Sequence, residues 1–190
     1  MHELRQDPFL LRWVILSDER ARRPLPPVRI PRLPAVDPRF CPFCPGNESQ
    51  TPDPIRSLPL PGEGGSWQVR VVPNLYPMLR VEVPLERSAE GPLDRVSGVG
   101  AHEVVIHSPR HTGTLPELSA AEVELLLLAW AERSQDLKRD GRMRHVQIFQ
   151  NHGLLAGATV EHPHSQVVGL PVVPRRTVEG LTVADRKSVV

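Results

Sequence analysis

The segment that decides the fold reads His162-Pro-His-Ser-Gln-Val-Val-Gly-Leu-Pro-Val-Val173. Its apolar part, residues 166–173, is rich in valine, which favours an extended strand. Side chains two residues apart on a strand point to the same face of a sheet. The sequence therefore predicts a strand region that can direct His162, His164 and Gln166 into one pocket.

A helix and further strands are predicted before this segment. Ser119-Ala-Ala-Glu122 has the pattern of a capping box, residues 123–130 supply an apolar face, and Asp140-Gly141 is a stop signal. Earlier segments are predicted as strands (12–17, 67–72, 103–108, 145–150), a polar turn (18–24) and a surface loop (85–99). Strands, one helix and further strands with short connections are typical of an α+β domain, with a mostly antiparallel sheet and one main helix packed on it.

The composition of the 190 residues argues against several classes of protein. The formal net charge is +1 and aromatic residues make up 4%, so the basic stripe or exposed aromatics of a nucleic-acid binder such as a zinc ribbon are not expected. No run approaches the roughly 18 apolar residues of a membrane span. The first residues also lack the charged-then-apolar layout of a signal peptide. We therefore predict a cytoplasmic protein without a nucleic-acid or membrane partner.

The two cysteines, Cys41 and Cys44, lie in a proline-rich stretch between Pro24 and Pro61. Prolines at this density exclude a long helix and indicate an extended, loop-rich segment. Two thiolates at this spacing can bind one tetrahedral ion through a tight turn. A redox pair, which usually begins a helix in a βαβ unit, and two unrelated thiols are the alternatives. We interpret the pair as half of a zinc site.

The other two zinc ligands must come from histidines, because the chain has no further cysteine. The candidates are the His162-Pro-His164 pair and His111, which follows a strand and a proline turn. His107, within the predicted strand, is the poorer candidate. Both members of the pair can bind the ion, or one can bind it while the other acts as a nucleophile. We interpret three other histidines as surface residues or as hydrogen-bonded core residues: His2, His102 and His145.

Groups that can contact a phosphate accompany these histidines. The amide of Gln166 can donate to a phosphoryl oxygen, and such positioning supplies most of the catalysis in phosphoryl transfer. The turn from Asn151 to Glu161 contains Gly153, Gly157 and Thr159, so its backbone amides can cradle a phosphate. The arginine run 20–23 can also reach phosphates, although solvated surface charges are the more common outcome.

Three separated motifs resemble the galactose-1-phosphate uridylyltransferases, the transferase branch of the histidine-triad superfamily. They are Cys41-Pro-Phe-Cys44-Pro-Gly-Asn-Glu48, Ser108-Pro-Arg-His111 with Thr114-Leu-Pro-Glu-Leu118, and Asn151-x-Gly153 leading to His162-Pro-His164-Ser-Gln166. The resemblance covers about residues 5–175. It implies a histidine-triad-like fold and zinc bound by four residues: Cys41, Cys44, His111 and His162.

The same resemblance implies a nucleotide site and a mechanism. His164 would be the nucleophile and Gln166 would contact the transferred phosphoryl group, in a ping-pong reaction that loses activity as the imidazole becomes protonated at low pH. Gln166 replaces the third histidine of the triad, which argues for transfer over hydrolysis. The implied nucleotide contacts are Arg20, Arg23, Asn74, Leu75, Asn151, Gly157, Ala158, Thr159 and Gln166.

Three functions follow as hypotheses. The first is uridylyl transfer from UDP-glucose to galactose 1-phosphate, as in galactose metabolism. The second is an adenylyl-transferring nucleotide-sugar phosphorylase, because Asn151-His-Gly153 and residues 157–166 look closer to adenylyl-transferring relatives and His152 stands where the bacterial sugar-utilising enzymes usually have lysine. The third is a non-catalytic, zinc-stabilised binding module.

The resemblance also bears on domain organisation. Family members are about twice as long and carry a second domain, so residues 1–184 are expected to be the N-terminal nucleotidyltransferase domain, with the C-terminal domain missing. Residues 185–190, Asp-Arg-Lys-Ser-Val-Val, contain one of only two lysines and are expected to be a non-native tail. The full-length protein is expected to be a homodimer that binds a nucleotide-sugar and a sugar phosphate.

Overall fold

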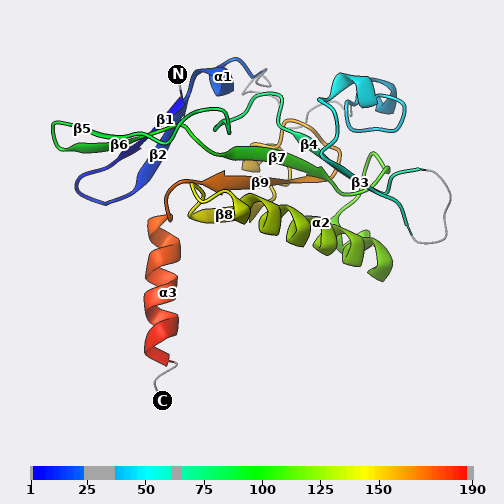
Figure 1. The fold of residues 1–190 in the computed structure, drawn as a ribbon. Helices are drawn as coiled ribbons and strands as arrows, with labels where there is room; N and C mark the ends of the chain where they lie inside the picture. The colour runs from blue at the N-terminus through cyan, green and yellow to red at the C-terminus, as the bar shows by residue number, and fades with distance from the viewer. Residues whose placement is uncertain (1, 24–36, 61–65, 188–190) are drawn as a thin grey trace.

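Antiparallel ladders build two sheets in the computed structural model, which describes residues 2–23, 37–60 and 66–187 (Figure 1). The five-stranded sheet has the order β3-β4-β7-β9-β8. Its strands are β3 (Arg56–Leu58), β4 (Val69–Pro73), β7 (Ala101–Ile106), β8 (His145–Phe149) and β9 (His164–Leu170). The four-stranded sheet has the order β2-β1-β6-β5. Its strands are β1 (His2–Gln6), β2 (Trp13–Ser17), β5 (Arg87–Glu90) and β6 (Leu93–Ser97).

The main helix, α2 (Ala120–Arg139), covers one face of the five-stranded sheet (Figure 1). Its first turn is capped as predicted: the Ser119 hydroxyl accepts from the Glu122 amide, and the Glu122 carboxylate accepts from the Ser119 amide. Apolar side chains of α2 and the sheet then form the largest core cluster: Leu58, Val69, Val71, Ala101, Val105, Leu125, Leu126, Ala129, Leu137 and Val167. The predicted α+β architecture, a mostly antiparallel sheet with one main helix packed on it, is confirmed.

Polar side chains on this helix-facing side form pairs. Arg133 of α2 donates through Nε and Nη2 to the two carboxylate oxygens of Glu103 in β7, both at 2.8 Å. Trp130 donates through Nε1 to the hydroxyl of Ser165 in β9 at 2.9 Å. A paired charge or hydroxyl can be buried at a much lower cost than an unpaired one. These contacts therefore attach α2 to β7 and β9.

The opposite side of the sheet carries His164 and Gln166, two of the site residues predicted from the sequence. In the β7–β9 ladder Ile106 pairs with His164, Val104 with Gln166 and His102 with Val168. Side chains alternate along a strand, so these residues share the face that α2 does not cover. Both strands are buried along their whole length, because the segment that follows residue 37 and the four-stranded sheet lie over that face.

Residues 85–99, predicted to be a surface loop, instead form the β5–β6 hairpin, so that prediction is wrong. The strands are joined at Gly91, whose φ of +58° is accessible to glycine without strain. β5 is exposed along its length, whereas Val96 of β6 is buried beside Leu4 and Leu79. An exposed edge strand of charged residues carries almost no alternation of polarity, which explains why the pattern was missed.

Other elements were also absent from the sequence prediction. Residues 18–21, predicted as a turn, form the short helix α1 (Asp18–Ala21), and Ser17 caps it by accepting from the Arg20 amide. β1, β3 and the helix α3 (Arg175–Lys187) were not predicted. In Figure 1, α3 extends away from the sheets beyond the end of β9. Of the expected non-native tail, residues 188–190 lie outside the described residues.

The chain makes a close backbone contact where β6 leads into β7. A Cβ atom added to Gly100 would lie 2.4 Å from the carbonyl oxygen of Gly169 in β9, and the φ of Gly100 is +155°. Only a residue without a side chain fits this approach.

Among the described residues, no helix has the length and hydropathy that a bilayer span requires.

Candidate functional site

Four cysteine and histidine side chains meet at the end of the sheet where β7 finishes and β9 begins. Cys41 and Cys44 come from the loop after a short 3₁₀ helix (Pro38–Phe40), His111 from the segment after β7, and His162 from the segment before β9. Their ligand atoms all lie within 4.8 Å of one another. The four residues expected to bind zinc are thus brought together, and the cluster can hold a metal ion.

The spacing of the donor atoms suits a tetrahedral ion. Sulfur and nitrogen ligands at about 2.3 and 2.0 Å from zinc are about 3.5 Å apart in tetrahedral geometry. The Cys44 Sγ atom lies 3.2 Å from His111 Nδ1 and 3.5 Å from His162 Nδ1, and Cys41 Sγ lies 3.7 Å from His162 Nδ1. Each thiol thus lies near an imidazole nitrogen at a separation close to this value, which favours the metal interpretation.

The protonation of His162 also fits a metal ligand. Its Nε2 atom lies 2.8 Å from the carbonyl oxygen of Ser108, which can only accept. Nε2 therefore carries the proton, and Nδ1 directs a lone pair toward the thiols. Burial, followed by the neighbouring Cys41, raises the pKa of the Cys44 thiol to about 11. A bound cation would oppose this shift, because a coordinating thiol is deprotonated.

The loop that carries the cysteines is held by its own short-range contacts. The Cys44 amide donates to the Cys41 carbonyl at 3.2 Å, and the side-chain amide of Asn47 donates to the same carbonyl at 2.8 Å. Gly46 has a φ of +89°, which glycine adopts readily. The Cys-Pro-Phe-Cys-Pro-Gly-Asn sequence thus encodes a turn that directs both thiols to one point.

His164 lies beside the cluster but turns toward the other side of the site. Its Nδ1 atom is 2.8 Å from the carbonyl oxygen of His162, so Nδ1 carries the proton and Nε2 has a free lone pair. Burial lowers the pKa of His164, an effect that the hydrogen bond to His162 opposes and the Arg23 charge reinforces. The ring packs edge-on against Phe43, with centroids 5.2 Å apart. The fold thus presents a neutral imidazole.

His164 lines a cavity of about 280 Å³ between the cysteine loop, the sheet and the segment before β9. Seven of the predicted site residues line it: Arg20, Arg23, Asn74, Leu75, Thr159, His164 and Gln166. Three others do not: Asn151, Gly157 and Ala158. Those three belong to the turn before β9, where Gly157 has a φ of +80° and the Ala158 amide donates to the carbonyl of Gly153. The turn supports the cavity wall near Thr159.

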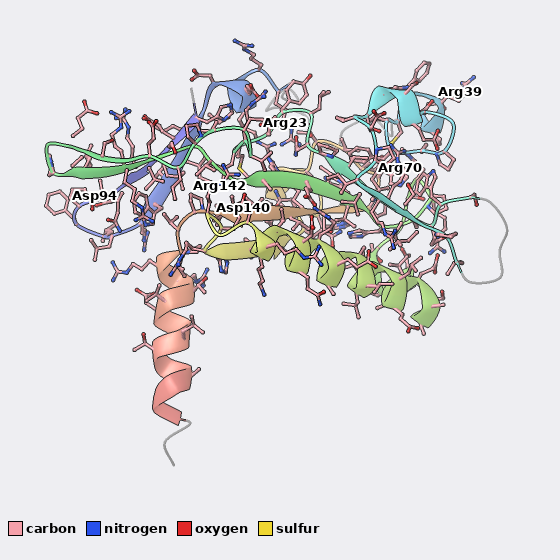
Figure 2. All side chains as sticks on the ribbon, viewed as in Figure 1. Arg23, Arg39, Arg70, Asp94, Asp140 and Arg142 are labelled. Carbon is pink, nitrogen blue, oxygen red and sulfur yellow. The ribbon has the colours of Figure 1, made fainter. Side chains whose placement is uncertain are left out.

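Two arginines supply positive charge to this cavity. Arg23 donates to the hydroxyl of Thr159, and Arg20 donates to the carbonyl of Tyr76 at 3.4 Å. Neither forms an ion pair with a carboxylate among the described residues. Burial lowers the pKa of both, and Arg23 lowers that of Arg20 further, yet guanidinium groups stay charged at neutral pH. Figure 2 shows Arg23 on the side of the sheet opposite α2. The cavity therefore suits an anion.

Sequence reasoning missed several residues of the cavity wall. Most are apolar or small side chains of the cysteine loop, β4 and β7: Pro42, Phe43, Gln50, Thr51, Pro52, Val72, Pro73, Tyr76, Val104 and Val160. Alternation along β4 was the available signal, because Val72 lies two residues before Asn74. His102 was interpreted as a surface or satisfied core residue; it is buried and hydrogen-bonded, and its partners include Gln166 at 2.8 Å.

His107, the rejected alternative to His111, lies outside the cluster. It follows β7, is fully buried, and packs edge-on against Trp130 with ring centroids 6.1 Å apart. Neither of its ring nitrogens has a hydrogen-bond partner among the described residues. Burial, and then the neighbouring His164 and His162, lower its pKa to about 3. His107 is therefore a neutral packing residue between the site and α2.

The sequence of this chain is similar to those of known proteins over most of its length. A family model described as "Galactose-1-phosphate uridyl transferase, N-terminal domain" matches residues 1–174. ADP-glucose phosphorylase from Arabidopsis thaliana is 37% identical over 176 residues, which are 90% of this chain and 49% of that protein. Galactose-1-phosphate uridylyltransferase from Thermotoga maritima is 30% identical over 93% of this chain and 49% of that protein. The chain thus spans about half the length of these relatives.

Solved structures give the same result. A structure titled "Structure of uridylyltransferase" superimposes with a TM-score of 0.70 and 29% identity, covering 98% of this chain and 52% of that one. An ADP-glucose phosphorylase from Arabidopsis thaliana with bound ADP-glucose superimposes with a TM-score of 0.60 and 31% identity, covering 92% of this chain and 50% of that one. The chain therefore belongs to the galactose-1-phosphate uridylyltransferase family and matches the N-terminal domain of its members.

Proposed function

We propose that this chain carries the nucleophile of a nucleotidyltransferase that moves a uridylyl group from UDP-glucose to galactose 1-phosphate. The observation that carries the proposal is the hydrogen bond between the His164 ring and the His162 carbonyl. Its Nδ1–H is bound to the His162 carbonyl at 2.8 Å, so the Nε2 lone pair is free in a cavity that also holds Arg20 and Arg23. A neutral imidazole beside two cations suits attack on a phosphate ester.

The reaction proceeds in two balanced steps. In the first, His164 Nε2 forms a bond to the α-phosphorus of the nucleotide-sugar, and the bond from that phosphorus to the bridging oxygen breaks. The electron pair leaves with the sugar 1-phosphate. In the second step, a phosphate oxygen of the acceptor sugar phosphate attacks the same phosphorus, and the P–N bond breaks to return a neutral imidazole. Neither leaving group needs a proton. The first leaves through a phosphate oxygen, and the second is the His164 imidazole nitrogen; both are weak bases.

The neighbouring side chains stabilise the charge on the transferred group. Arg20 and Arg23 neutralise the phosphate oxygens, and Gln166 donates an amide hydrogen to a nonbridging oxygen. A glutamine can neither protonate a leaving group nor activate water as a histidine does. The presence of Gln166 at this position supports transfer to a second phosphate over hydrolysis.

We assign zinc to Cys41, Cys44, His111 and His162, because two thiols and two imidazole nitrogens at these separations match its preferences. When bound, the ion would supply a rigid cross-link between the cysteine loop, the segment after β7 and the segment before β9. The chain then uses this rigidity through His162, whose carbonyl oxygen holds the Nδ1–H of His164. The cluster thereby fixes the direction of the nucleophilic lone pair.

Adenylyl transfer by a nucleotide-sugar phosphorylase is the second candidate. It is supported by the 37% identity to the Arabidopsis ADP-glucose phosphorylase, compared with 30% to the Thermotoga uridylyltransferase. The chemistry at His164 is the same for both candidates. Only the base and the acceptor of the nucleotidyl group differ.

Intact-protein mass spectrometry tests the proposal. The purified protein is incubated with UDP-glucose or with ADP-glucose, and its mass is followed with time. We expect a gain of one uridylyl group from UDP-glucose, whereas a faster gain of one adenylyl group would select the second candidate. His145→Ala, a histidine substitution in β8 outside the cavity, is the matched control and should form the adduct normally. A protein that loses its fold on chelation yet gains no nucleotidyl group would be a binding module.

A further inference from the structure

His102 makes contacts that determine how a neighbouring amide is oriented. It lies in the middle of the five-stranded sheet, on the face that carries His164 and Gln166, and only 4% of its surface is exposed. Its ring nitrogens have different partners: Nδ1 accepts from the backbone amide of Met78 at 3.0 Å, and Nε2 lies 2.8 Å from Oε1 of Gln166.

The contact with Met78 selects one tautomer of His102. A backbone N–H can only donate, so Nδ1 must be unprotonated, and the single proton of the neutral ring must reside on Nε2. Burial is the main reason that the pKa of His102 is lowered to about 4, although the hydrogen bond to Gln166 opposes it. The ring is therefore neutral at physiological pH, and Nε2–H donates to whatever faces it.

This tautomer in turn fixes Gln166. An amide has one oxygen that accepts and one NH₂ group that donates, and only the oxygen can face the Nε2–H of His102. The NH₂ group of Gln166 is then left for the cavity that Gln166 lines. The Asn74 side chain also lies near His102. Its oxygen accepts from the Tyr76 amide at 2.9 Å, so its NH₂ group is the end that lies 3.1 Å from His102 Nε2. Because Nε2 carries a proton in this tautomer, it does not accept from that NH₂ group.

We propose that His102 is a positioning residue that orients the Gln166 amide, so that its NH₂ group donates to the phosphoryl group transferred to His164. The inference rests on the proposed function for the identity of the ligand, but the amide orientation follows from the contacts among Met78, His102 and Gln166 alone. The Met78 amide thus sets the tautomer of His102, and His102 in turn sets the orientation of the Gln166 amide toward the phosphoryl group. His102 itself is not among the described residues that line the cavity.

The first test reads the tautomer directly on the unsubstituted protein. Two-dimensional ¹H–¹⁵N spectra of the histidine rings distinguish a protonated from an unprotonated nitrogen. We expect His102 to show a protonated Nε2 and an unprotonated Nδ1 between pH 8 and pH 6. A protonated Nδ1, or a doubly protonated ring in this range, would overturn the proposal. Because this measurement needs neither turnover nor a variant, it decides the orientation even where His102→Phe does not fold.

The second test is a double-substitution cycle on the rate of nucleotidyl-adduct formation. Loss of one preorganised donor costs on the order of 100-fold in rate, which we expect for Gln166→Leu. His102→Phe leaves the Gln166 oxygen without its donor and should slow the reaction about 10-fold. In the Gln166→Leu background, His102→Phe should change the rate by less than about twofold, because its effect passes through the amide. An equal loss in both backgrounds would show a merely structural role.

Two further variants test whether the effect is specific to the His102 donor. His102→Gln keeps an NH₂ donor near the Gln166 oxygen and should recover most of the rate lost in His102→Phe. His145→Phe removes a similar contact, His145 Nε2 to Gln147 Oε1 at 3.2 Å, at a place outside the cavity, and should leave the rate unchanged. If the unsubstituted protein forms no adduct with either nucleotide-sugar, the proposed function fails, while the tautomer measurement still decides the assignment of His102.

Discussion

The two faces of the five-stranded sheet bury polar groups for different purposes, and β7 and β9 contribute to both. Toward α2, Glu103 meets Arg133 through two hydrogen bonds, and Ser165 meets Trp130. Toward the cavity, His164 is hydrogen-bonded at one ring nitrogen within the part of the chain that the structure describes, and Gln166 keeps its NH₂ group for the cavity. Alternate residues of the same strands thus either pair with side chains of α2 or leave hydrogen-bonding capacity for a ligand. Stability and reactivity are separated by side-chain alternation.

The largest expected effect concerns the nucleophile on the cavity face. His164→Ala removes the only atom that we propose to bond to phosphorus, so no nucleotidyl adduct should form with UDP-glucose or ADP-glucose. The free energy of unfolding should change much less than in a core substitution, because the ring lines a cavity. Mass spectrometry and denaturant unfolding measure the two quantities. Labelled nucleotide attaching to this variant at the normal rate would contradict the separation of roles.

The metal cluster is expected to matter for both quantities. Cys44→Ser replaces a thiol whose sulfur lies 3.2 Å from His111 Nδ1, and should weaken zinc binding by more than the roughly 10–100-fold lost when a partner outside the ligand set is removed. Adduct formation should fall with metal content, because the His162 carbonyl no longer holds His164 firmly. Elemental analysis with a chelator competition measures the affinity. Full metal content and a normal rate in this variant would argue against the assignment.

On the helix face, a substitution should affect stability alone. Glu103→Ala removes the bidentate partner of the partly buried Arg133 guanidinium and leaves Asp136, at 3.0 Å, as its remaining carboxylate, so we expect a loss of about 1–3 kcal/mol of unfolding free energy. Adduct formation per folded molecule should be unchanged, since Glu103 points away from the cavity. Unfolding in urea and mass spectrometry below the transition measure both. A loss of rate beyond the loss of folded protein would show that the two faces are coupled.

The smallest effect is a pH dependence. The pKa of His102 is lowered to about 4, mainly by burial, from an ordinary value near 6.5. Between about pH 6.5 and 4 the unfolded chain therefore binds a proton that the folded chain does not, so stability decreases as the pH falls. The contribution is at most about 1.4 kcal/mol per pH unit. In His102→Phe the slope of unfolding free energy against pH should be shallower by up to this amount; an unchanged slope would mean that His102 is protonated when folded.

The sequence predicted the parts of the fold that have strong local signals. The capping box at Ser119 and Glu122, the apolar strands and the Cys-x-x-Cys turn are each specified by neighbours in the chain. The β5–β6 hairpin and β1 were missed because β5 is exposed and β1 has one apolar residue among polar ones, and both are held by strand pairing such as that of β1 with β6, which lie far apart in the sequence. Short-range patterns carry no information on such pairing.

The site was predicted unevenly for a similar reason. The cysteine pair was noticed from its spacing, and the resemblance to a known family added His111 and His162, and the structure brings these four residues together. The apolar cavity wall and the role of His102 depend on which strands are neighbours, and the contact from Met78 to His102 joins residues 24 positions apart. The turn residues Asn151, Gly157 and Ala158 were expected to line the cavity but do not. Their glycine-rich pattern indicated a turn and did not specify which atoms face the ligand.

The six residue pairs of the β7–β9 ladder also limit where this domain can gain or lose a residue. One residue inserted between His164 and Leu170 would reverse the parity of the strand, and the imidazole or the amide would then point toward α2. The turn between Asn151 and Glu161 lies outside any ladder of the described residues, so its length can vary without this inversion. Length variation among natural homologues should therefore concentrate in that turn and be almost absent from the seven residues that follow Pro163.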